Sequence, residues 1–449
     1  MADLPEDFIR AIRARLGANA ERFFESLAEP SPVSIRLNPL KSCTLSGEPV
    51  PWCSSGLYLG DRPSFTLDPA FHGGGYYVQE ASSMLLEQAV RQTVGTESPL
   101  LAVDLCGAPG GKSTHLASLL SGESLLISNE VIRSRASILA ENMTKWGYEN
   151  VIVTNNDPKD FGRMPAFADL VVIDAPCSGE GLFRKDPQAS KEWSPQSVGL
   201  CASRQRRIVG DAWTVLKPGG VLIYSTCTYN ETENINNLRW MNDEYQAEFL
   251  PVQLKHSWGV ETIRDGECIG YQCFPHQVKG EGFFFSALRK PGNGLGAPIR
   301  GRKPISRTTN KVIDLLKPWV LDPDELLFFQ HGQQVRFMRK YDEKSLVAVL
   351  DNLHVVQAGT AVGEVMKDKV VPDHGLALSV RRNRDHLPGV PLTRDQALAY
   401  LRKDAIMPGP IPVGYHIMEF EGVGLGWANV LQNRINNMYP SAWRIRKSP

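Results

Sequence analysis

Two cysteines stand where a thiol could act on a bound substrate. Cys177 follows an apolar run at residues 170–173, and Cys227 follows another at residues 221–224. Short apolar runs of this kind are typical of buried parallel strands. Because ligands of open α/β sheets bind at the carboxyl ends of the strands, both thiols are expected at one edge of one sheet. A thiolate there could form a covalent bond to a substrate. The alternative is that each cysteine is only a small apolar side chain at a strand end.

A glycine-rich stretch, CGAPGGK at residues 106–112, separates a strand-like run at residues 100–105 from a helix-like run at residues 115–120. Glycines let the backbone approach a ligand closely, and the free N–H groups of a helix start favour a polar or anionic group. The stretch is not a phosphate loop, because Cys106 stands where that loop requires its first glycine. It also lacks the dinucleotide-binding pattern GxGxxG. It therefore predicts a nucleotide-type cofactor site of a third kind.

Three carboxylates follow the next strand-like runs. Glu130 comes after residues 125–128, about 20 residues beyond the glycine stretch, where a carboxylate can accept hydrogen bonds from ribose hydroxyls. Asp157 follows residues 151–154, and Asp174 follows residues 170–173. Polar groups at the ends of successive parallel strands converge on one crevice, so these acids are expected beside the glycine stretch. The alternative is that some of them only cap helices.

Methylation of carbon-5 of cytosine needs a thiol beside a methyl-donor pocket. Carbon-5 is a poor nucleophile, so a thiolate first adds at carbon-6, and the activated ring then attacks an electrophilic methyl group. A base removes the carbon-5 proton, and the thiol leaves. A carboxylate reading the cytosine edge is also needed, and Asp174 could serve as the base or face the cofactor. Since the cytosine must be unstacked, single-stranded or loop RNA is the easiest substrate.

The elements that must position these residues alternate between strand-like and helix-like runs over residues 100–290. This alternation predicts an α/β fold with a doubly wound, Rossmann-like sheet. We expect a small N-terminal lobe at residues 1–75, the Rossmann-like domain at residues 76–290, and a linker and intermediate region at residues 291–370. The linker opens with the glycine-rich residues 291–296. Residues 371–449 predict a small β-rich domain with exposed aromatics beside arginines, as suits RNA binding. Ordinary core tryptophans and a basic tail are the alternative.

Composition favours a protein of the cytoplasm. Apolar residues make up 42% of the chain and charged residues 22%, and no apolar run approaches the roughly 20 residues that span a membrane. The first residues lack the features of a signal peptide. The eight cysteines show no zinc-ligand spacing, so we expect reduced thiols and no metal. Net charge is zero overall but +7 over residues 291–449, which favours the C-terminal third as the polyanion-binding part. A solvated surface would explain the same excess.

Three motifs together resemble the Nop/Sun (Fmu) family of RNA cytosine-carbon-5 methyltransferases. They are DLCGAPGGK at residues 104–112, DAPCSGEG at residues 174–181 and STCT at residues 225–228. The resemblance covers about residues 30–290. The ending, NMYP at residues 437–440 and WRIR at residues 443–446, is similar to the RsmF branch, which methylates bacterial 16S rRNA and carries a C-terminal PUA-like domain. The resemblance implies a Rossmann-like core that uses S-adenosyl-L-methionine, with an N-terminal lobe and a PUA-like domain that both bind RNA.

The resemblance also implies a role for each site residue. Cys227 would be the nucleophile, and Cys177 would assist release of the product, an assignment that spacing alone could not make. Glu130 would hold the cofactor ribose, Asp157 would contact adenine, and Asp174 would lie near the methionine part. The loop around the cofactor would be formed by Cys106, Gly107, Ala108, Pro109, Gly110, Gly111 and Lys112. Gly107 replaces the family's usual alanine and is expected only to loosen this loop. Lys185 is similar to a family position near the active site, although a solvated lysine would also explain it.

The expected reaction is therefore methylation of carbon-5 of a cytosine in 16S rRNA, free or in the small ribosomal subunit, by a monomer that binds no metal and no membrane. Two alternatives remain at this point. One is a tRNA cytosine-carbon-5 methyltransferase on the same core. The other is a noncatalytic RNA-binding ribosome assembly factor that keeps the fold, which would predict damage to the glycine loop or to both thiols. Neither kind of damage is present.

Overall fold

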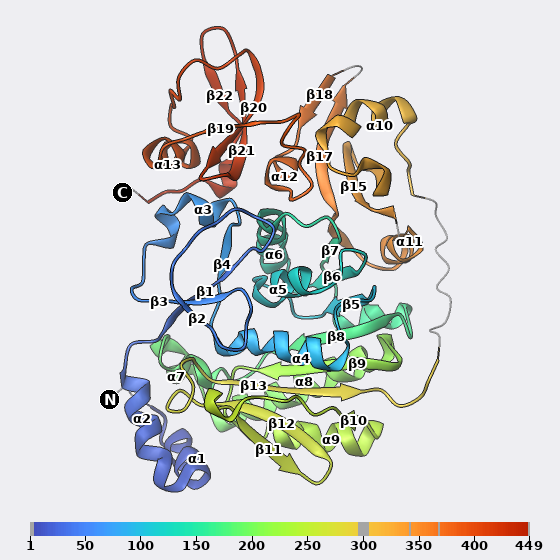
Figure 1. The fold of residues 1–449 in the computed structure, drawn as a ribbon. Coiled ribbons are helices and arrows are strands. Elements are labelled where there is room, and N and C mark those ends of the chain that lie inside the picture. The colour runs from blue at the N-terminus through green and yellow to red at the C-terminus, as the bar shows by residue number, and fades with distance from the viewer. Residues whose placement is uncertain (1–3, 295–304, 341–342, 367–368, 448–449) are drawn as a thin grey trace.

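A ten-stranded mixed sheet forms the centre of the protein (Figure 1). The structure, a computed structural model, describes residues 4–294, 305–340, 343–366 and 369–447. Of the glycine-rich linker expected at residues 291–296, residues 295 and 296 lie outside this range. Most of the sheet follows the order β11-β12-β13-β9-β8-β5-β6-β7-β16, and β10 pairs with β13. Its strands are β5 (Leu101–Asp104), β6 (Leu125–Asn129), β7 (Val151–Thr154), β8 (Ala168–Asp174), β9 (Leu216–Thr226), β10 (Glu248–Phe249), β11 (Glu261–Asp265), β12 (Cys268–Cys273), β13 (Phe283–Arg289) and β16 (Val355–Ala358).

Strands β5 to β9 are parallel and run in the order β7-β6-β5-β8-β9. The chain begins at β5, moves outward to β7, and then returns to the other side of β5. The carboxyl ends of β5 and β8 therefore flank the point where the strand order reverses, which is where α/β sheets bind ligands. These strands form because their apolar runs are buried on both faces, and Val103, Ile127 and Val172 are inaccessible to solvent.

Helices cover the sheet. Helix α5 (Gly111–Leu119) lies between α4 (Leu86–Thr93) and α6 (Arg133–Trp146), while α8 (Pro195–Val215) packs on β8 and β9, and α9 (Ile235–Tyr245) packs on β12. The start of α8 is determined locally. Pro195 occupies its first turn, and Ser194 and Ser197 form reciprocal side-chain to backbone hydrogen bonds. Such a capping box satisfies N–H groups that a helix start would otherwise leave free. The short α7 (Pro187–Glu192) precedes it.

The N-terminal lobe contains its own antiparallel sheet, in the order β2-β3-β1-β4. Its strands and short helix are β1 (Val33–Leu37), β2 (Glu48–Pro49), β3 (Gly56–Leu59), β4 (Tyr76–Val78) and α3 (Pro69–His72). Two helices precede this sheet, α1 (Glu6–Leu16) and α2 (Ala20–Ala28). Phe8 and Ile12 lie one turn apart on α1 and are buried, and Phe8 packs edge-on against Phe183 of the core. Apolar residues at this spacing therefore attach the N-terminal helices to the core.

The C-terminal third forms two further four-stranded sheets at one end of the molecule, drawn orange and red in Figure 1. The first follows the order β14-β15-β17-β18 and the second β19-β20-β21-β22. Strand β16 leaves this region and pairs with β7 of the central sheet. The elements are α10 (Asn310–Leu316), β14 (Leu326–His331), β15 (Gln334–Arg339), α11 (Glu343–Asn352), β17 (Thr360–Met366), β18 (Lys369–Pro372), α12 (His374–Leu378), β19 (Gly389–Pro391), α13 (Arg394–Arg402), β20 (Gly414–Phe420), β21 (Val423–Val430) and β22 (Ile435–Asn437).

A search of the described residues for helices able to cross a membrane found none with the required length and apolar character.

Candidate active site

The two cysteines singled out in the sequence lie side by side. Strands β8 and β9 are parallel neighbours, and Asp174 at the end of β8 pairs in register with Ser225 near the end of β9. After each of these two strands, the backbone leaves the sheet and carries its cysteine to the same edge. The Sγ atoms of Cys177 and Cys227 are 3.2 Å apart, and both residues are half-buried. The structure thus places two thiols within reach of a single substrate atom.

The Cys177 thiol is held in its protonated form. The hydrogen bond to Cys227, together with burial, raises the pKa of the Cys177 thiol well above its ordinary value. Cys177 is therefore protonated at neutral pH and can donate its S–H to the sulfur of Cys227. A sulfur that accepts a hydrogen bond is stabilised as the thiolate, which is the nucleophilic form of cysteine.

A partly buried ion pair lies beside the thiols. Lys112 Nζ is 2.8 Å from Asp174 Oδ1, and Ser225 Oγ donates to the same oxygen over 3.1 Å. Burial lowers the pKa of Lys112, but the attraction of Asp174, with a further contribution from Cys227, outweighs it and leaves the pKa raised. Lys112 therefore remains charged and supplies positive potential next to both sulfurs. The glycine loop and the motif that carries Cys177 meet through this pair.

Glu233, which sequence reasoning missed, holds the loop of Cys177 in place through hydrogen bonds. Its carboxylate accepts hydrogen bonds from the backbone N–H of Ser178, at 3.0 and 3.3 Å, and from Gln205 Nε2 at 2.7 Å. Gln205 also donates to the carbonyl of Pro176. Glu233 is inaccessible to solvent, and burial raises its pKa to about 7. No local signal marked it, because Glu233 stands in the polar run NETEN at residues 230–234.

This buried acid makes stability depend on pH. Because the folded protein holds the Glu233 proton up to a pH of about 7, the free energy of unfolding should fall as pH rises from the ordinary glutamate pKa of 4.5 to about 7. Glu233→Gln removes that titration. Between pH 5 and pH 8, wild type should lose up to about 3 kcal/mol more than the variant in denaturant unfolding. Glu231→Gln, an exposed neighbour, should behave like wild type; equal losses in wild type and Glu233→Gln would contradict the raised pKa.

The glycine loop is packed closely around Gly107. Its N–H donates to the carbonyl of Asn129 over 2.8 Å, and a Cβ at this position would lie 2.7 Å from Ser113 Oγ. That hydroxyl is fixed in position by a hydrogen bond, since it donates to Asp104 Oδ2 over 2.7 Å in a fully buried contact. A methyl group at this position would therefore force the Ser113 side chain to shift, so glycine here also lets the loop pack closely. Gly110, at φ +122°, occupies backbone space that glycine prefers.

Gly107→Ala should consequently distort the loop. Overpacking in a buried site costs about 1–3 kcal/mol, so we expect the affinity for S-adenosylhomocysteine to fall about tenfold or more in calorimetric titration. Gly162→Ala is the matched control, because a Cβ there meets no atom within 4 Å. Unchanged affinity in Gly107→Ala, with the fold intact by circular dichroism, would refute this account of the loop.

Two of the predicted acids accept hydrogen bonds from backbone N–H groups close to helix starts. Glu130 is buried and accepts from the N–H of Ile132, just before α6, and its other oxygen lies 3.4 Å from Arg135 Nη1. Asp157 accepts from the N–H of Lys159 and caps a short 3₁₀ helix. The helix-cap alternative therefore holds for Asp157 but not for Glu130, because no side chain caps α6. It does not exclude a second contact, because each carboxylate has more acceptor sites than these bonds occupy.

A cavity of about 430 Å³ opens at the reversal point of the sheet. Of the predicted site residues, those that line it are Cys106, Ala108, Glu130, Asp174, Cys177 and Cys227. Lys112 contacts the cavity wall through Asp174, and Asp157 precedes the lining residue Pro158. Gly107, Pro109, Gly110 and Gly111 form the loop behind the wall. Two arginines that sequence reasoning missed, Arg204 and Arg207, lie three residues apart on α8 and also line the cavity.

The residues present fit a nucleoside cofactor. Val131 and Ile132 line the cavity yet are 53% and 49% exposed, which suits a planar apolar base resting against them. Glu130 lies next to them and offers a carboxylate for ribose hydroxyls. The glycine loop extends from α6, where Arg135 donates to the carbonyl of Ala108, to Lys112, which pairs with Asp174. Base, sugar and a charged tail can therefore be placed along one path from α6 to Cys227.

The sheet order, the nucleoside-sized cavity and the thiols place the protein in the class of Rossmann-fold methyltransferases. Solved structures support this class. A methyltransferase homolog from Pyrococcus horikoshii is 26% identical, with a TM-score of 0.51 over 64% of this chain and 100% of that one. NSun6 from the same organism is 20% identical, with a TM-score of 0.54 over 65% and 100% of the two chains, and shows a similar fold.

Relatives by sequence narrow the class. Ribosomal RNA small subunit methyltransferase F of Cronobacter sakazakii is 30% identical over 97% of this chain and 95% of its own length, and the enzyme of the same name from Shewanella loihica is 30% identical over 98% and 95%. The profile of the 16S rRNA methyltransferase RsmB/F family matches residues 95–289. Profiles of the RsmF N-terminal domain and the RsmF PUA domain match residues 4–81 and 388–445. The chain belongs to the RsmB/F family of 16S rRNA methyltransferases.

These findings confirm the family resemblance, the Rossmann-like fold with its PUA domain, and the expectation of a methyltransferase that uses S-adenosyl-L-methionine. The individual site residues and the boundaries expected for the domains stay predictions.

Proposed function

We propose that this protein methylates carbon-5 of a cytosine in 16S rRNA, through a covalent bond between Cys227 and carbon-6. The observation that carries the proposal is the pair of sulfurs 3.2 Å apart at the wall of the cofactor-sized cavity. A noncatalytic assembly factor would have no use for two adjacent thiols held beside a partly buried, charged lysine.

The two cysteines would act at different steps of the reaction. Cys227, which accepts the hydrogen bond of Cys177 and lies near charged Lys112, is the thiolate that bonds to carbon-6 of the cytosine. S-adenosyl-L-methionine, when bound, supplies an electrophilic methyl group. Carbon-5 takes the methyl group, a base then removes the carbon-5 proton, and the bond from carbon-6 to sulfur breaks. Cys177 keeps its proton at neutral pH and is placed to assist this release.

The cofactor residues follow from the cavity. Glu130 would hold the ribose, Asp157 would contact the adenine, and Asp174, fixed by Lys112 and Ser225, would face the methionine part. The loop of residues 106–112 would wrap around the cofactor from the other side. Arg204 and Arg207 at the cavity wall would attract the RNA phosphates that flank the target cytosine.

The remaining parts would bind RNA. We assign this role to the lobe at residues 1–75 and to the PUA-like region at residues 371–449, with the methyltransferase domain at residues 76–290 and the intermediate region at residues 291–370 between them. The substrate would be 16S rRNA, free or in the small ribosomal subunit. The protein would act in the cytoplasm as a monomer, and the methyl transfer would use no metal.

The test is transfer of a labelled methyl group from S-adenosyl-L-methionine to three substrates: naked 16S rRNA, purified small subunits lacking the modification, and bulk tRNA. We expect 5-methylcytosine in one of the first two, identified by nucleoside mass spectrometry. Methylation of tRNA alone would show that the proposed substrate is wrong and that the proposed reaction is right. A methylated base other than 5-methylcytosine would overturn the proposed reaction.

A further inference from the structure

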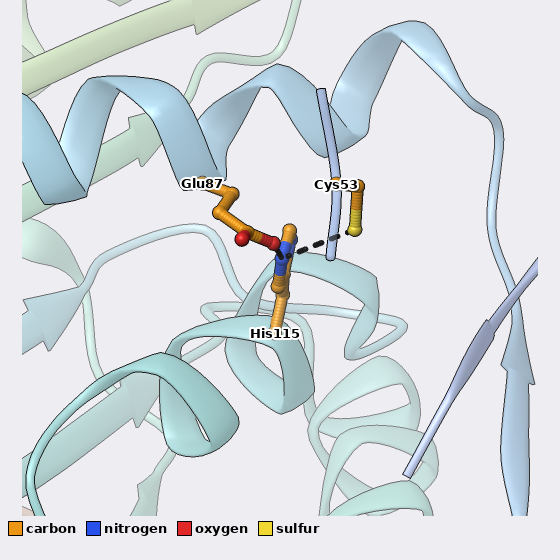
Figure 2. Close-up of side chains that lie close together, drawn as sticks. All are labelled: Cys53, Glu87 and His115. Carbon is orange, nitrogen blue, oxygen red and sulfur yellow. Dashed lines mark hydrogen bonds and ion pairs between the residues drawn. The ribbon is translucent and has the colours of Figure 1, made fainter. Parts of the chain in front are cut away.

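Three buried side chains outside the active site converge on one point. They are Cys53, Glu87 and His115, exposed by 5%, 2% and 1%, and Figure 2 shows them directed toward one another. Cys53 lies in the turn between β2 and β3 of the N-terminal lobe, Glu87 on α4 and His115 on α5. Neither the proposed reaction nor the cofactor cavity involves any of them.

The distances match those between ligands of one metal ion. Cys53 Sγ is 3.8 Å from His115 Nε2, and His115 Nε2 is 3.3 Å from Glu87 Oε2. All three ligand atoms lie within 4.8 Å of one another. Tetrahedral zinc with bonds of about 2.0–2.3 Å keeps neighbouring ligand atoms roughly 3.3–3.8 Å apart. An ion could therefore be held by these atoms with only small side-chain movements.

We propose that Cys53, Glu87 and His115 bind one Zn²⁺ ion. Thiolate, imidazole and carboxylate are the three ligand types that zinc uses in proteins. Magnesium and calcium prefer sets of oxygen ligands and would gain little from the sulfur and the nitrogen. A fourth position would be filled by the second oxygen of Glu87 or by a water molecule.

The charges around the cluster add to this selectivity. Zinc binds cysteine as the thiolate, so it must displace the thiol proton of Cys53. Two cations face the cluster: Arg36 of β1, whose charge acts on Cys53 and His115, and Arg91 of α4, whose Nε is 3.0 Å from Glu87 Oε1. Both repel a dication, so only a metal that bonds strongly to thiolate can occupy the site.

Bound zinc would join the lobe to the catalytic domain. Two contacts already join the turn that carries Cys53 to α4. The N–H of Ser54 donates to the Glu87 carboxylate at 3.2 and 3.3 Å, and Gln88 donates to the carbonyl of Trp52 over 3.0 Å. Helix α5 begins at Gly111, inside the predicted cofactor loop. A metal bond from Cys53 to His115 would therefore fix the lobe against the helix on which the cofactor loop depends. Its effect would be on stability rather than on the chemical step.

The proposal can be tested on the full chain, expressed without a histidine tag. Because the catalytic cysteines could also take up zinc, the titration uses a Cys177→Ala/Cys227→Ala background. We expect one equivalent of zinc in competition with a chelating dye, no displacement by millimolar magnesium or calcium, weaker binding as pH falls, and a higher melting temperature with zinc. Cobalt should give a thiolate-to-metal absorption band.

Variants assign the site. In the same background, Cys53→Ser should weaken zinc binding at least tenfold and remove the cobalt band, whereas Cys43→Ser, a half-buried cysteine of the same lobe outside the cluster, should change neither. If Cys53→Ser fails to fold, the melting temperature and zinc stoichiometry of the background protein still decide the question. Failure of that protein to bind zinc at micromolar concentrations, or undiminished binding in Cys53→Ser, would overturn the proposal.

Discussion

Cys227→Ala should abolish methyl transfer while leaving the protein able to bind its cofactor and RNA. Without a thiolate to add at carbon-6, carbon-5 of cytosine is not nucleophilic enough to take the methyl group, so we expect the rate to fall about 10⁴-fold or more. The fold should survive, because Cys227 is only half-buried and alanine leaves a small gap. The measurement is single-turnover transfer of a labelled methyl group, together with calorimetric titration of S-adenosylhomocysteine.

The matched control for this variant is Cys201→Ala. Cys201 is a half-buried cysteine on α8 that does not line the cavity, so its removal should leave the rate within about twofold of wild type. Normal turnover by Cys227→Ala would show that the nucleophile has been assigned to the wrong thiol. Loss of activity in Cys177→Ala without any trapped RNA would point the same way.

Cys177→Ala should trap the enzyme on its product. If Cys177 assists release, its loss leaves Cys227 free to attack but slows the breaking of the bond from sulfur to carbon-6. We expect most of the active enzyme to run as a covalent RNA adduct on a denaturing gel after mixing with substrate and cofactor. The adduct should contain Cys227 in the cross-linked peptide identified by mass spectrometry.

The double variant Cys177→Ala/Cys227→Ala is the control for the trapping experiment, because it lacks the attacking sulfur and should form no adduct. Turnover by Cys177→Ala at the wild-type rate would show that the hydrogen bond between the two sulfurs is not needed for release. An adduct that persists in the double variant would mean that another residue attacks the cytosine.

The parallel half of the sheet could be predicted because its strands carry the signal locally. Each of β5 to β8 is a short apolar run buried on both faces, and the chemical residues follow directly at the carboxyl ends. Once the strands are taken as parallel neighbours, Cys177 and Cys227 must share an edge. Their contact at 3.2 Å follows from the pairing of β8 with β9, which the sequence pattern could suggest without any distance.

Features that depend on contacts between distant segments could not be predicted. Cys53 and His115 are separated by 62 positions and come from different parts of the fold, so no ligand spacing marks them. In the sequence Glu233 resembles any glutamate in a polar stretch, and only the folded structure shows that it accepts a hydrogen bond from Ser178 in the loop of Cys177. The tight space at Gly107 depends on the Ser113 rotamer and its bond to Asp104. In each case tertiary packing, rather than local pattern, determines the role.

Strand β16, at residues 355–358, protects the central sheet against aggregation by pairing with β7. Without it, β7 would end the central sheet with a row of unpaired backbone groups on a strand whose side chains are all buried in the intact protein. Such an apolar edge is a template for pairing with another chain, and therefore for aggregation. The C-terminal third thus covers the edge of the catalytic sheet. A shortened chain ending near residue 290 would keep every predicted catalytic residue but would expose β7 as an aggregation-prone edge strand.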